Sequence, residues 1–261
     1  MLPWFRACRF WESACLRMRR RELELNELGW WGNWAELEWI GKDAYVLTSG
    51  EMPEVFFNRG GLLTCGGFTS SMDGLESRFR TLGFAPAIMV YESCSGATRS
   101  LQRRGYQRID TMTVLAAIEH SELRGGSEVE VAEARSHEGW SRAYLLAFYG
   151  GLGLLPAVER AVSRIRKAES TLLEARLGGE VAGVLALHRT SRLVGAYCVG
   201  TVPRLRRRGV AGALLARARE IASSERRTLI LQSLGSDGNG GFYLQRGFVA
   251  FYSKALMQKK G

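Results

Sequence analysis

Hydrophobic and polar positions along the first part of the chain change between the period of a strand and the period of a helix. Strands are expected over 55–64, 86–91 and 106–118, and helices over 4–27, 71–82 and 97–104. Gly83 and Gly105 stand where helices commonly end. Strands that alternate with helices in this way indicate an α/β fold.

A second series of elements follows from residue 128 onward. Its expected strands are 128–134, 170–177, 180–188, 192–202, 228–233 and 248–257, and its expected helices are 138–147, 156–167, 209–223 and 239–246. Gly178-Gly179 joins two of these strands, which predicts a hairpin. From residue 192 the strand, helix, strand, helix, strand order of the first part reappears, so we interpret the chain as two related halves.

The length of 261 residues also favours two domains. The stretch before residue 128 ends in Gly125-Gly126-Ser127, as a linker would. We therefore predict a first domain over 1–120, a linker over 121–127 and a second domain over 128–261. Six of the seven tryptophans lie in the first 39 residues, which indicates a packed core edge near the start of the chain.

Composition excludes several classes of protein. The longest uncharged stretch has 16 residues, over 143–158, and glycines and Pro156 interrupt it, so we expect no membrane span. Arg6 and Arg9 interrupt the region where a signal peptide would be apolar, and a cytoplasmic location is expected.

Five scattered cysteines and three histidines predict neither a disulfide framework nor a metal site, and each cysteine is expected to be a small buried apolar side chain.

The net charge of +10 is concentrated in one region. Residues 203–227 hold eight arginines against two glutamates. Such a local surplus favours an anionic partner, either a phosphorylated cofactor or a nucleic acid. No aromatic residues interleave the arginines, and the cluster adjoins the expected start of a helix, which disfavours nucleic acid. Free backbone N–H groups at a helix start, followed by small residues, suit a pyrophosphate.

Two segments of the second half resemble the GNAT acyltransferase superfamily. Arg-Arg-Arg-Gly-Val-Ala at 206–211 fits the family pattern [QR]-x-x-G-x-[GA]. About 30 residues later, Ser-x-x-Asn-x-x-Phe-Tyr-Leu-Gln-Arg-Gly-Phe at 236–248 is similar to the family's later segment, in which a Tyr lies near a helix end and Gly-Phe opens the last strand. The resemblance implies two GNAT-like halves of the α/β class, each a mixed central sheet flanked by helices. The N-terminal half would be degenerate, and the acyl-CoA site would lie in the C-terminal half.

The resemblance further implies an N-acyltransferase that moves an acetyl or other acyl group from acetyl-CoA or another acyl-CoA to an amine by direct attack. Backbone groups of Thr201 and Val202 would pair with the pantetheine arm. Tyr243 would protonate the departing thiolate, and its ordinary pKa near 10 keeps it protonated at pH 7. Ser236 stands where many members have Asn, which leaves that cofactor contact open. The pyrophosphate would be held by Arg206, Arg207, Arg208, Gly209, Val210, Ala211 and Gly212.

In this fold the first two helices of the catalytic half wall the acceptor pocket, which here implies Trp140, Phe148, Tyr149 and the glycine-rich loop 150–155. An apolar lining of this kind favours a small organic amine or an apolar peptide end over a polyanion. The glycines would allow the loop to act as a lid.

The general base stays open, because no Asp or Glu occurs between Glu180 and Glu220. Glu174, His188, Tyr197 and a water molecule are the candidates. The missing carboxylate is also consistent with an alternative function, a sensor that binds acyl-CoA without catalysis. A second and less favoured alternative is a nucleic-acid-binding protein. No metal is expected, and the sequence leaves the oligomeric state and the acyl length open.

Overall fold

The computed structural model describes residues 20–117 and 128–259. Two sequence-based expectations lie outside these ranges: the first part of the helix expected over 4–27, and the linker expected over 121–127. Among the described residues, no helix is both long enough and apolar enough to cross a membrane.

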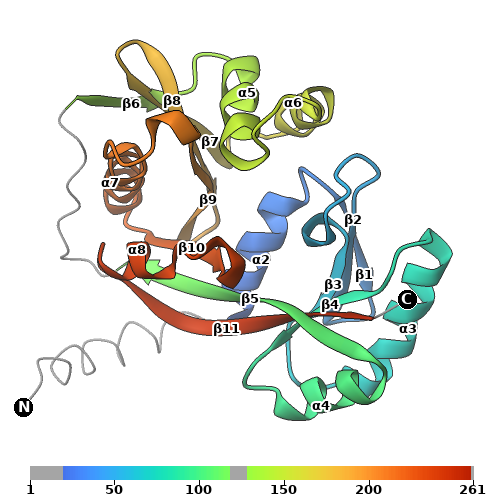
Figure 1. The fold of residues 1–261 in the computed structure, drawn as a ribbon. Coiled ribbons are helices and arrows are strands. Elements are labelled where there is room, and N and C mark those ends of the chain that lie inside the picture. The colour runs from blue at the N-terminus through green and yellow to red at the C-terminus, as the bar shows by residue number, and fades with distance from the viewer. Residues whose placement is uncertain (1–19, 118–127, 260–261) are drawn as a thin grey trace, which may run out of the picture.

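The described chain forms α-helices around one mixed sheet of 11 strands, as expected for the α/β class (Figure 1). The first half contains α2 (Arg20–Trp31), β1 (Glu36–Ile40), β2 (Ala44–Thr48), the short helix η1 (Val55–Phe57), β3 (Arg59–Leu62), α3 (Phe68–Leu82), β4 (Ala87–Tyr91), α4 (Ser95–Arg103) and β5 (Tyr106–Ala117). The second half contains β6 (Val129–Glu133), α5 (His137–Phe148), α6 (Leu155–Ser163), β7 (Ser170–Leu177), β8 (Glu180–Arg189), β9 (Leu193–Thr201), η2 (Pro203–Leu205), α7 (Val210–Ser224), β10 (Thr228–Leu234), η3 (Gly235–Asp237), α8 (Gly240–Leu244) and β11 (Phe248–Lys259).

The expectation for residues 55–64 is only partly correct. Residues 55–57 form η1, and the strand β3 begins at Arg59. The reason lies in Asn58, whose side chain donates to the carbonyl oxygens of Met52 and Glu54 and accepts from the amide of Ser49. These bonds hold the chain in a turn before the sheet begins. The antiparallel hairpin of β1 and β2 was not expected from the sequence.

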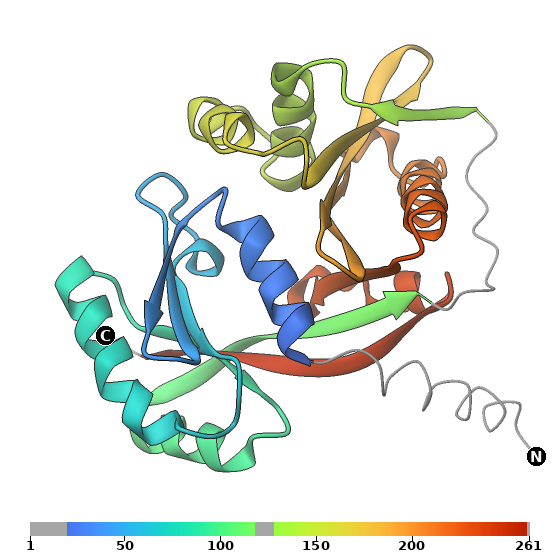
Figure 2. The same ribbon diagram turned by 180° about the vertical axis from the view of Figure 1, so that it is seen from behind.

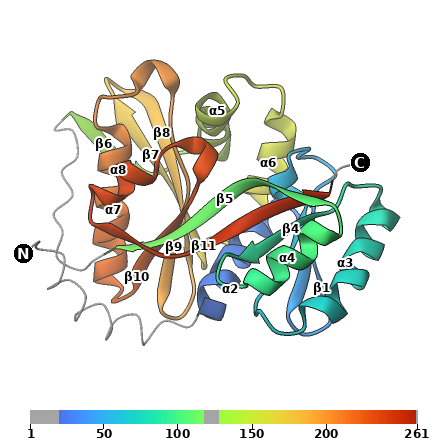
Figure 3. The ribbon, with the colours of Figure 1, turned by 60° about the horizontal axis from the view of Figure 1, so that its bottom comes forward.

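The two halves exchange their last strands. The strand order is β1-β2-β3-β4-β11-β5-β10-β9-β8-β7-β6. The last strand of the second half, β11, therefore lies between β4 and β5 of the first half, and β5 lies between β11 and β10. Figure 3 shows β5 and β11 running side by side from one half to the other. Neither half has a complete sheet without a strand from the other.

Helices on both faces enclose the core of the second half. A Cβ atom added at Gly183 of β8 would meet Val210 and Leu214 of α7, whereas one added at Gly200 of β9 would meet Phe148 of α5. Since Gly183 pairs with Thr201 and Gly200 pairs with Val184, these two contacts mark opposite faces of the sheet. The helix α2 lies between the halves and packs against strands of both (Figure 2).

The cysteines differ from the expectation in one respect. Cys65, in the segment between β3 and α3, forms a disulfide with Cys94, the residue before α4. The two positions are 29 residues apart, so nothing in the local spacing indicated that the fold brings them together. The remaining cysteine of the described ranges, Cys198, is free and half-buried.

Candidate active site

The strands β9 and β10 separate at the centre of the second half. Their parallel pairing ends at Ala196 and Leu231, although β9 continues to Thr201 and β10 to Leu234. On its other edge β9 carries a bulge, because Cys198 and Val199 together lie opposite one residue of β8. The bulge places Cys198 in the left-handed region, with φ 53°. Backbone groups of β9 beyond Ala196 therefore have no partner on β10.

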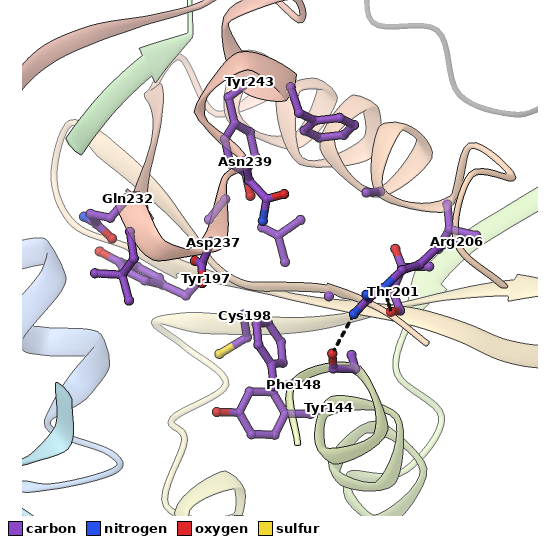
Figure 4. A pocket seen from close by; sticks show the side chains of 18 of the residues that line it. Tyr144, Phe148, Tyr197, Cys198, Thr201, Arg206, Gln232, Asp237, Asn239 and Tyr243 are labelled. Atoms are coloured by element: carbon purple, nitrogen blue, oxygen red, sulfur yellow. Dashed lines mark hydrogen bonds between the residues drawn. The ribbon is translucent and has the colours of Figure 1, made fainter. Parts of the chain in front are cut away.

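A cavity of about 970 Å³ occupies the space where the two strands separate. Figure 4 shows Tyr243 and Asn239 on one side of it and Tyr144 and Phe148 on the opposite side. Both halves of the chain contribute to the walls. Its lining includes Trp31, Glu54, Phe56, Phe57, Tyr144, Phe148, Tyr149, Tyr197, Cys198, Thr201, Arg206, Arg207, Gly209, Val210, Ala211, Gly212, Gln232, Asp237, Asn239, Tyr243 and Arg246.

The start of α7 forms one end of this cavity. Gly209 is the N-cap, with φ 80°, and no side chain caps the helix. The amides of the first turn, at Val210, Ala211 and Gly212, therefore lack a side-chain acceptor and border the cavity. Uncapped amides at the positive end of a helix dipole are suited to a phosphate group. This is where the sequence predicted the pyrophosphate.

The arginines of the turn before α7 take different positions. Arg206 links the ends of β9 and α5, because its Nη2 donates to the carbonyl of Ala147 at 3.1 Å and its Nε to that of Thr201 at 3.4 Å (Figure 4). Arg207 also lines the cavity. Arg208 is exposed and lies outside the lining, as does the buried Val202. Of the residues predicted over 201–212, the structure thus brings all to the cavity except Arg208 and Val202.

Tyr243 lies on the short helix α8 and is almost completely buried at the cavity wall. Burial, and then the nearby Asp237, raise the pKa of Tyr243 to about 12. The hydroxyl therefore stays protonated at neutral pH, as an acid must. Ser236 does not reach the cavity lining, since its hydroxyl donates to Oδ2 of Asp110 at 2.6 Å. Asn239, three residues later in the same segment, lines the cavity instead.

The predicted acceptor wall is formed in part. Phe148 and Tyr149 line the cavity, and both are among the exposed large hydrophobic side chains. Trp140 does not line it: the side chain is fully buried and its Nε1 donates to the carbonyl of Leu173 at 3.1 Å. Trp140 is thus a core residue of α5. Tyr144, one turn further along α5, takes the place at the cavity.

Of the three side chains considered as the base, the structure brings only Tyr197 to the cavity. Its hydroxyl donates to Oδ1 of Asn26 at 2.7 Å, and burial raises its pKa well above the ordinary value. Glu174 is buried in an ion pair with Arg176 at 2.8 Å, away from the lining. His188 is hydrogen-bonded through Nδ1 to Ser170, at 2.9 Å.

Two carboxylates outside the predicted set line the cavity, Glu54 and Asp237. Burial, and then the charge of Asp110, raise the pKa of Asp237. Asp237 lies inside the segment 236–248 that carried the resemblance, so its position was available as a signal. Glu54 belongs to the other half of the chain, and no local pattern pointed to it.

Residues 130–248 match the family model described as the acetyltransferase (GNAT) family. This segment is a GNAT domain. The matched residues contain the opening between β9 and β10, the start of α7 and Tyr243. None of the curated proteins matches the sequence of the chain.

Solved structures share the fold of both halves. A GCN5-related N-acetyltransferase from Kribbella flavida has a TM-score of 0.71 at 15% identity, over 94% of this chain and 97% of that one. A GCN5-related N-acetyltransferase from Sphaerobacter thermophilus has a TM-score of 0.65 at 15% identity, over 87% and 83%. A conserved protein of unknown function from Staphylococcus epidermidis has a TM-score of 0.64 at 13% identity, over 87% and 94%. At these identities the likeness concerns the fold.

Proposed function

We propose that this GNAT protein transfers an acetyl or other acyl group from acyl-CoA to the amine of a small molecule or peptide. One observation carries the proposal: β9 and β10 separate next to the uncapped start of α7. This combination offers a slot with free backbone groups for an amide-containing arm and an anion site at its end. Acyl-CoA has both parts, a pantetheine arm and a pyrophosphate.

Different residues of the cavity have different roles in the proposed reaction. Backbone groups around Thr201 bind the pantetheine arm, and the amides of 210–212 with Arg206 and Arg207 bind the pyrophosphate. The amine nitrogen attacks the thioester carbonyl, so that a C–N bond forms and the C–S bond breaks. Tyr243 gives its proton to the departing thiolate. The proton of the amine leaves to water or to a cavity carboxylate.

The alternative of a non-catalytic acyl-CoA sensor rested on the lack of a carboxylate near the central strand. Glu54 and Asp237 at the cavity weaken that reason. The nucleic-acid alternative is also weakened, because several arginines of the basic stretch have acidic partners. Arg204 pairs with Glu180, Arg217 with Glu220 and Arg227 with Glu225.

We further propose that only the second half handles the cofactor and that the division 1–120, 121–127 and 128–261 separates a degenerate domain from a catalytic one. Both halves start a helix from a left-handed glycine, Gly67 before α3 and Gly209 before α7. The turn before Gly67 contains no arginine, and its Cys65 is joined to Cys94. This supports a common origin and a lost phosphate site in the first half.

The test is release of free thiol from acetyl-CoA, measured across a panel of amines and peptides with enzyme-free and acceptor-free controls. We expect thiol release that depends on both the enzyme and an amine. Acetyl-CoA binding in calorimetry without turnover of any acceptor would contradict the proposed transferase and favour the sensor.

A further inference from the structure

The first half of the chain forms one wall of the cavity in the second half. Trp31 reaches the cavity from the end of α2, and Glu54, Phe56 and Phe57 reach it from the turn before β3. The GNAT family model matches only residues 130–248, so these four residues lie outside the matched segment. These four residues reach the cavity only because the first half of the chain packs against the second.

Glu54 brings a carboxylate to this wall. Its Oε2 is buried and has no hydrogen-bond partner among the residues that the structure describes. Its charge acts on the hydroxyl of Tyr149, the residue that follows α5 in the second half. Burial, and then Glu54, raise the pKa of Tyr149, which keeps this hydroxyl a donor. A buried carboxylate oxygen without a donor is costly unless a ligand supplies one.

The turn that carries Glu54 is held firmly. The side chain of Asn58 donates to the carbonyl of Glu54 itself at 3.1 Å. Arg59, fully buried, donates to the carbonyl of Phe56 and lies over its ring, with 4.1 Å from the guanidinium carbon to the ring centroid. Arg59 is held in turn by Glu27 of α2, at 2.7 Å. These contacts fix the position of Glu54 and Phe56 without using the Glu54 carboxylate.

Aromatic rings line the cavity together with Glu54. Trp31 contacts Phe56 edge to face, with ring centroids 4.7 Å apart, and Tyr197 at 6.0 Å. In the second half, Tyr144 contacts Phe148 at 4.9 Å and Tyr149 at 6.0 Å. Faces of aromatic rings attract cations, and an apolar body fits between them.

Charged side chains of both signs line the cavity: Arg206, Arg207 and Arg246, and the carboxylates Glu54 and Asp237. Of the two carboxylates, Glu54 has a buried oxygen without a hydrogen-bond partner among the described residues. An anionic group is therefore favoured beside the arginines before α7, and a cationic group beside Glu54.

We propose that Glu54 binds the ammonium group of the acceptor, and that the acceptor is a cationic amine on an aromatic or other apolar body. This assignment rests on the proposed transferase function and names its acceptor class. In this proposal, the first half of the chain selects the acceptor. A carboxylate or phosphate on the acceptor next to the amine would face Glu54 and be disfavoured.

The test uses three amines that are cationic at neutral pH, benzylamine, 2-phenylethylamine and tryptamine, each compared with the alcohol of the same shape. Phenylalanine serves as an amine that carries an added carboxylate. Binding is measured by titration calorimetry without acetyl-CoA, so that the result does not depend on acyl transfer. Thiol release from acetyl-CoA is measured in parallel for the same amines.

We expect at least one amine to bind wild-type protein about tenfold or more tightly than its alcohol, and Glu54→Gln to remove that preference while leaving the affinity for the alcohol unchanged. Glu54→Asp keeps the charge and should retain part of the preference. Glu51→Gln is the matched control, because Glu51 lies in the same segment but pairs with Arg160 outside the cavity, and it should behave as wild type.

Equal affinity of wild type for every amine and its alcohol, or an unchanged preference in Glu54→Gln, would overturn the assignment. Tighter binding of phenylalanine than of 2-phenylethylamine would do so as well. If the amine preference is present and depends on Glu54 while no thiol is released from acetyl-CoA, the proposed transferase function fails and the ammonium site remains.

Discussion

Lys254, on the exchanged strand β11, donates a hydrogen bond to Glu27 of α2, with 2.6 Å between Nζ and Oε2, and both side chains are almost completely buried. Lys254 also pairs with Glu24 at 3.0 Å, and Glu27 pairs with Arg59 of β3. Burial alone would lower the pKa of Lys254, but Glu24 and Glu27 raise it above its ordinary value. The end of the second half is thus tied to the first half by buried charges.

Replacing Lys254 by Met should be strongly destabilising. The change leaves Glu24 and Glu27 buried with one positive partner fewer, and removing one member of a buried ion pair costs about 3–5 kcal/mol. The free energy of unfolding from urea titrations measures the loss. Lys259→Met, on the same strand, removes a partly exposed pair with Glu76 and should cost less than about 1 kcal/mol. Similar losses in both variants would show that the buried cluster has no special role.

Residues 125–261 expressed alone should aggregate or show weak activity. This fragment keeps β10 and β11 but lacks β5, which lies between them, and β4, which pairs with the other edge of β11. Unpaired strand edges and uncovered apolar faces promote association. Size-exclusion chromatography and thiol release measure the outcome. A monomeric fragment with full activity would contradict the dependence of one half on the other.

Changes at the start of α7 should weaken the binding of acetyl-CoA. A charge-assisted hydrogen bond contributes roughly 1.5–3 kcal/mol, so we expect Arg206→Ala to reduce affinity about tenfold or more in calorimetry. Gly209→Glu should abolish binding, because it adds a negative charge at the anion site and a side chain where φ is 80°. Arg103→Ala, at the end of α4 in the first half, is the control and should have little effect. An equal loss of acetyl-CoA affinity in the control variant would argue against a pyrophosphate site at the start of α7.

Tyr243→Phe should lower kcat by about 10- to 100-fold, at the low end of general-acid effects, because a thiolate is a fairly stable leaving group. The KM values should change little, since the ring still packs against Phe242 and Phe248. Because the pKa of Tyr243 is about 12, the hydroxyl should stay protonated in assays up to pH 10. Wild-type kcat in the variant, under conditions where chemistry limits the rate, would remove the role.

The stability of the fold should decrease as the pH falls below about 6.5, the ordinary pKa of histidine. Burial lowers the pKa of His188 in the folded state. The unfolded chain therefore binds a proton at this residue before the folded chain does, so its contribution is complete above pH 6.5 and is lost as the pH falls toward the folded value. His188→Gln should flatten this dependence in thermal melts between pH 7 and 5. His137→Gln, whose side chain is exposed, should keep the wild-type dependence, and an equal flattening in this control would contradict the assignment to His188.

Local signals account for what the sequence could predict. The strand, turn and helix around Gly209, and the Tyr of α8, follow from periodicity and from a short motif within one half. The same is true of the hairpin at Gly178-Gly179. These elements depend on neighbours that are close along the chain, so their pattern is visible without the fold.

The remaining features depend on contacts between distant parts of the chain. Glu54 reaches the cavity only because the first half packs against the second, and Cys65 meets Cys94 only after β3 and β4 pair. Trp140 and Tyr144 lie four positions apart on α5, and periodicity did not distinguish the core residue from the cavity residue. The exchange of β5 and β11 is not visible in the hydrophobic and polar pattern of either strand.

The position of β11 also sets an order for folding during synthesis. Residues 20–117 emerge from the ribosome before residues 128–259, and domains commonly fold as they emerge. Here β4 and β5 must wait for a strand between them that is made after every other element described. The first half of the chain therefore leaves the ribosome with one strand of its sheet missing. The edges of β4 and β5 stay unpaired until residues 248–259 have been synthesised. Chaperone binding to the nascent chain should accordingly persist until that strand has emerged.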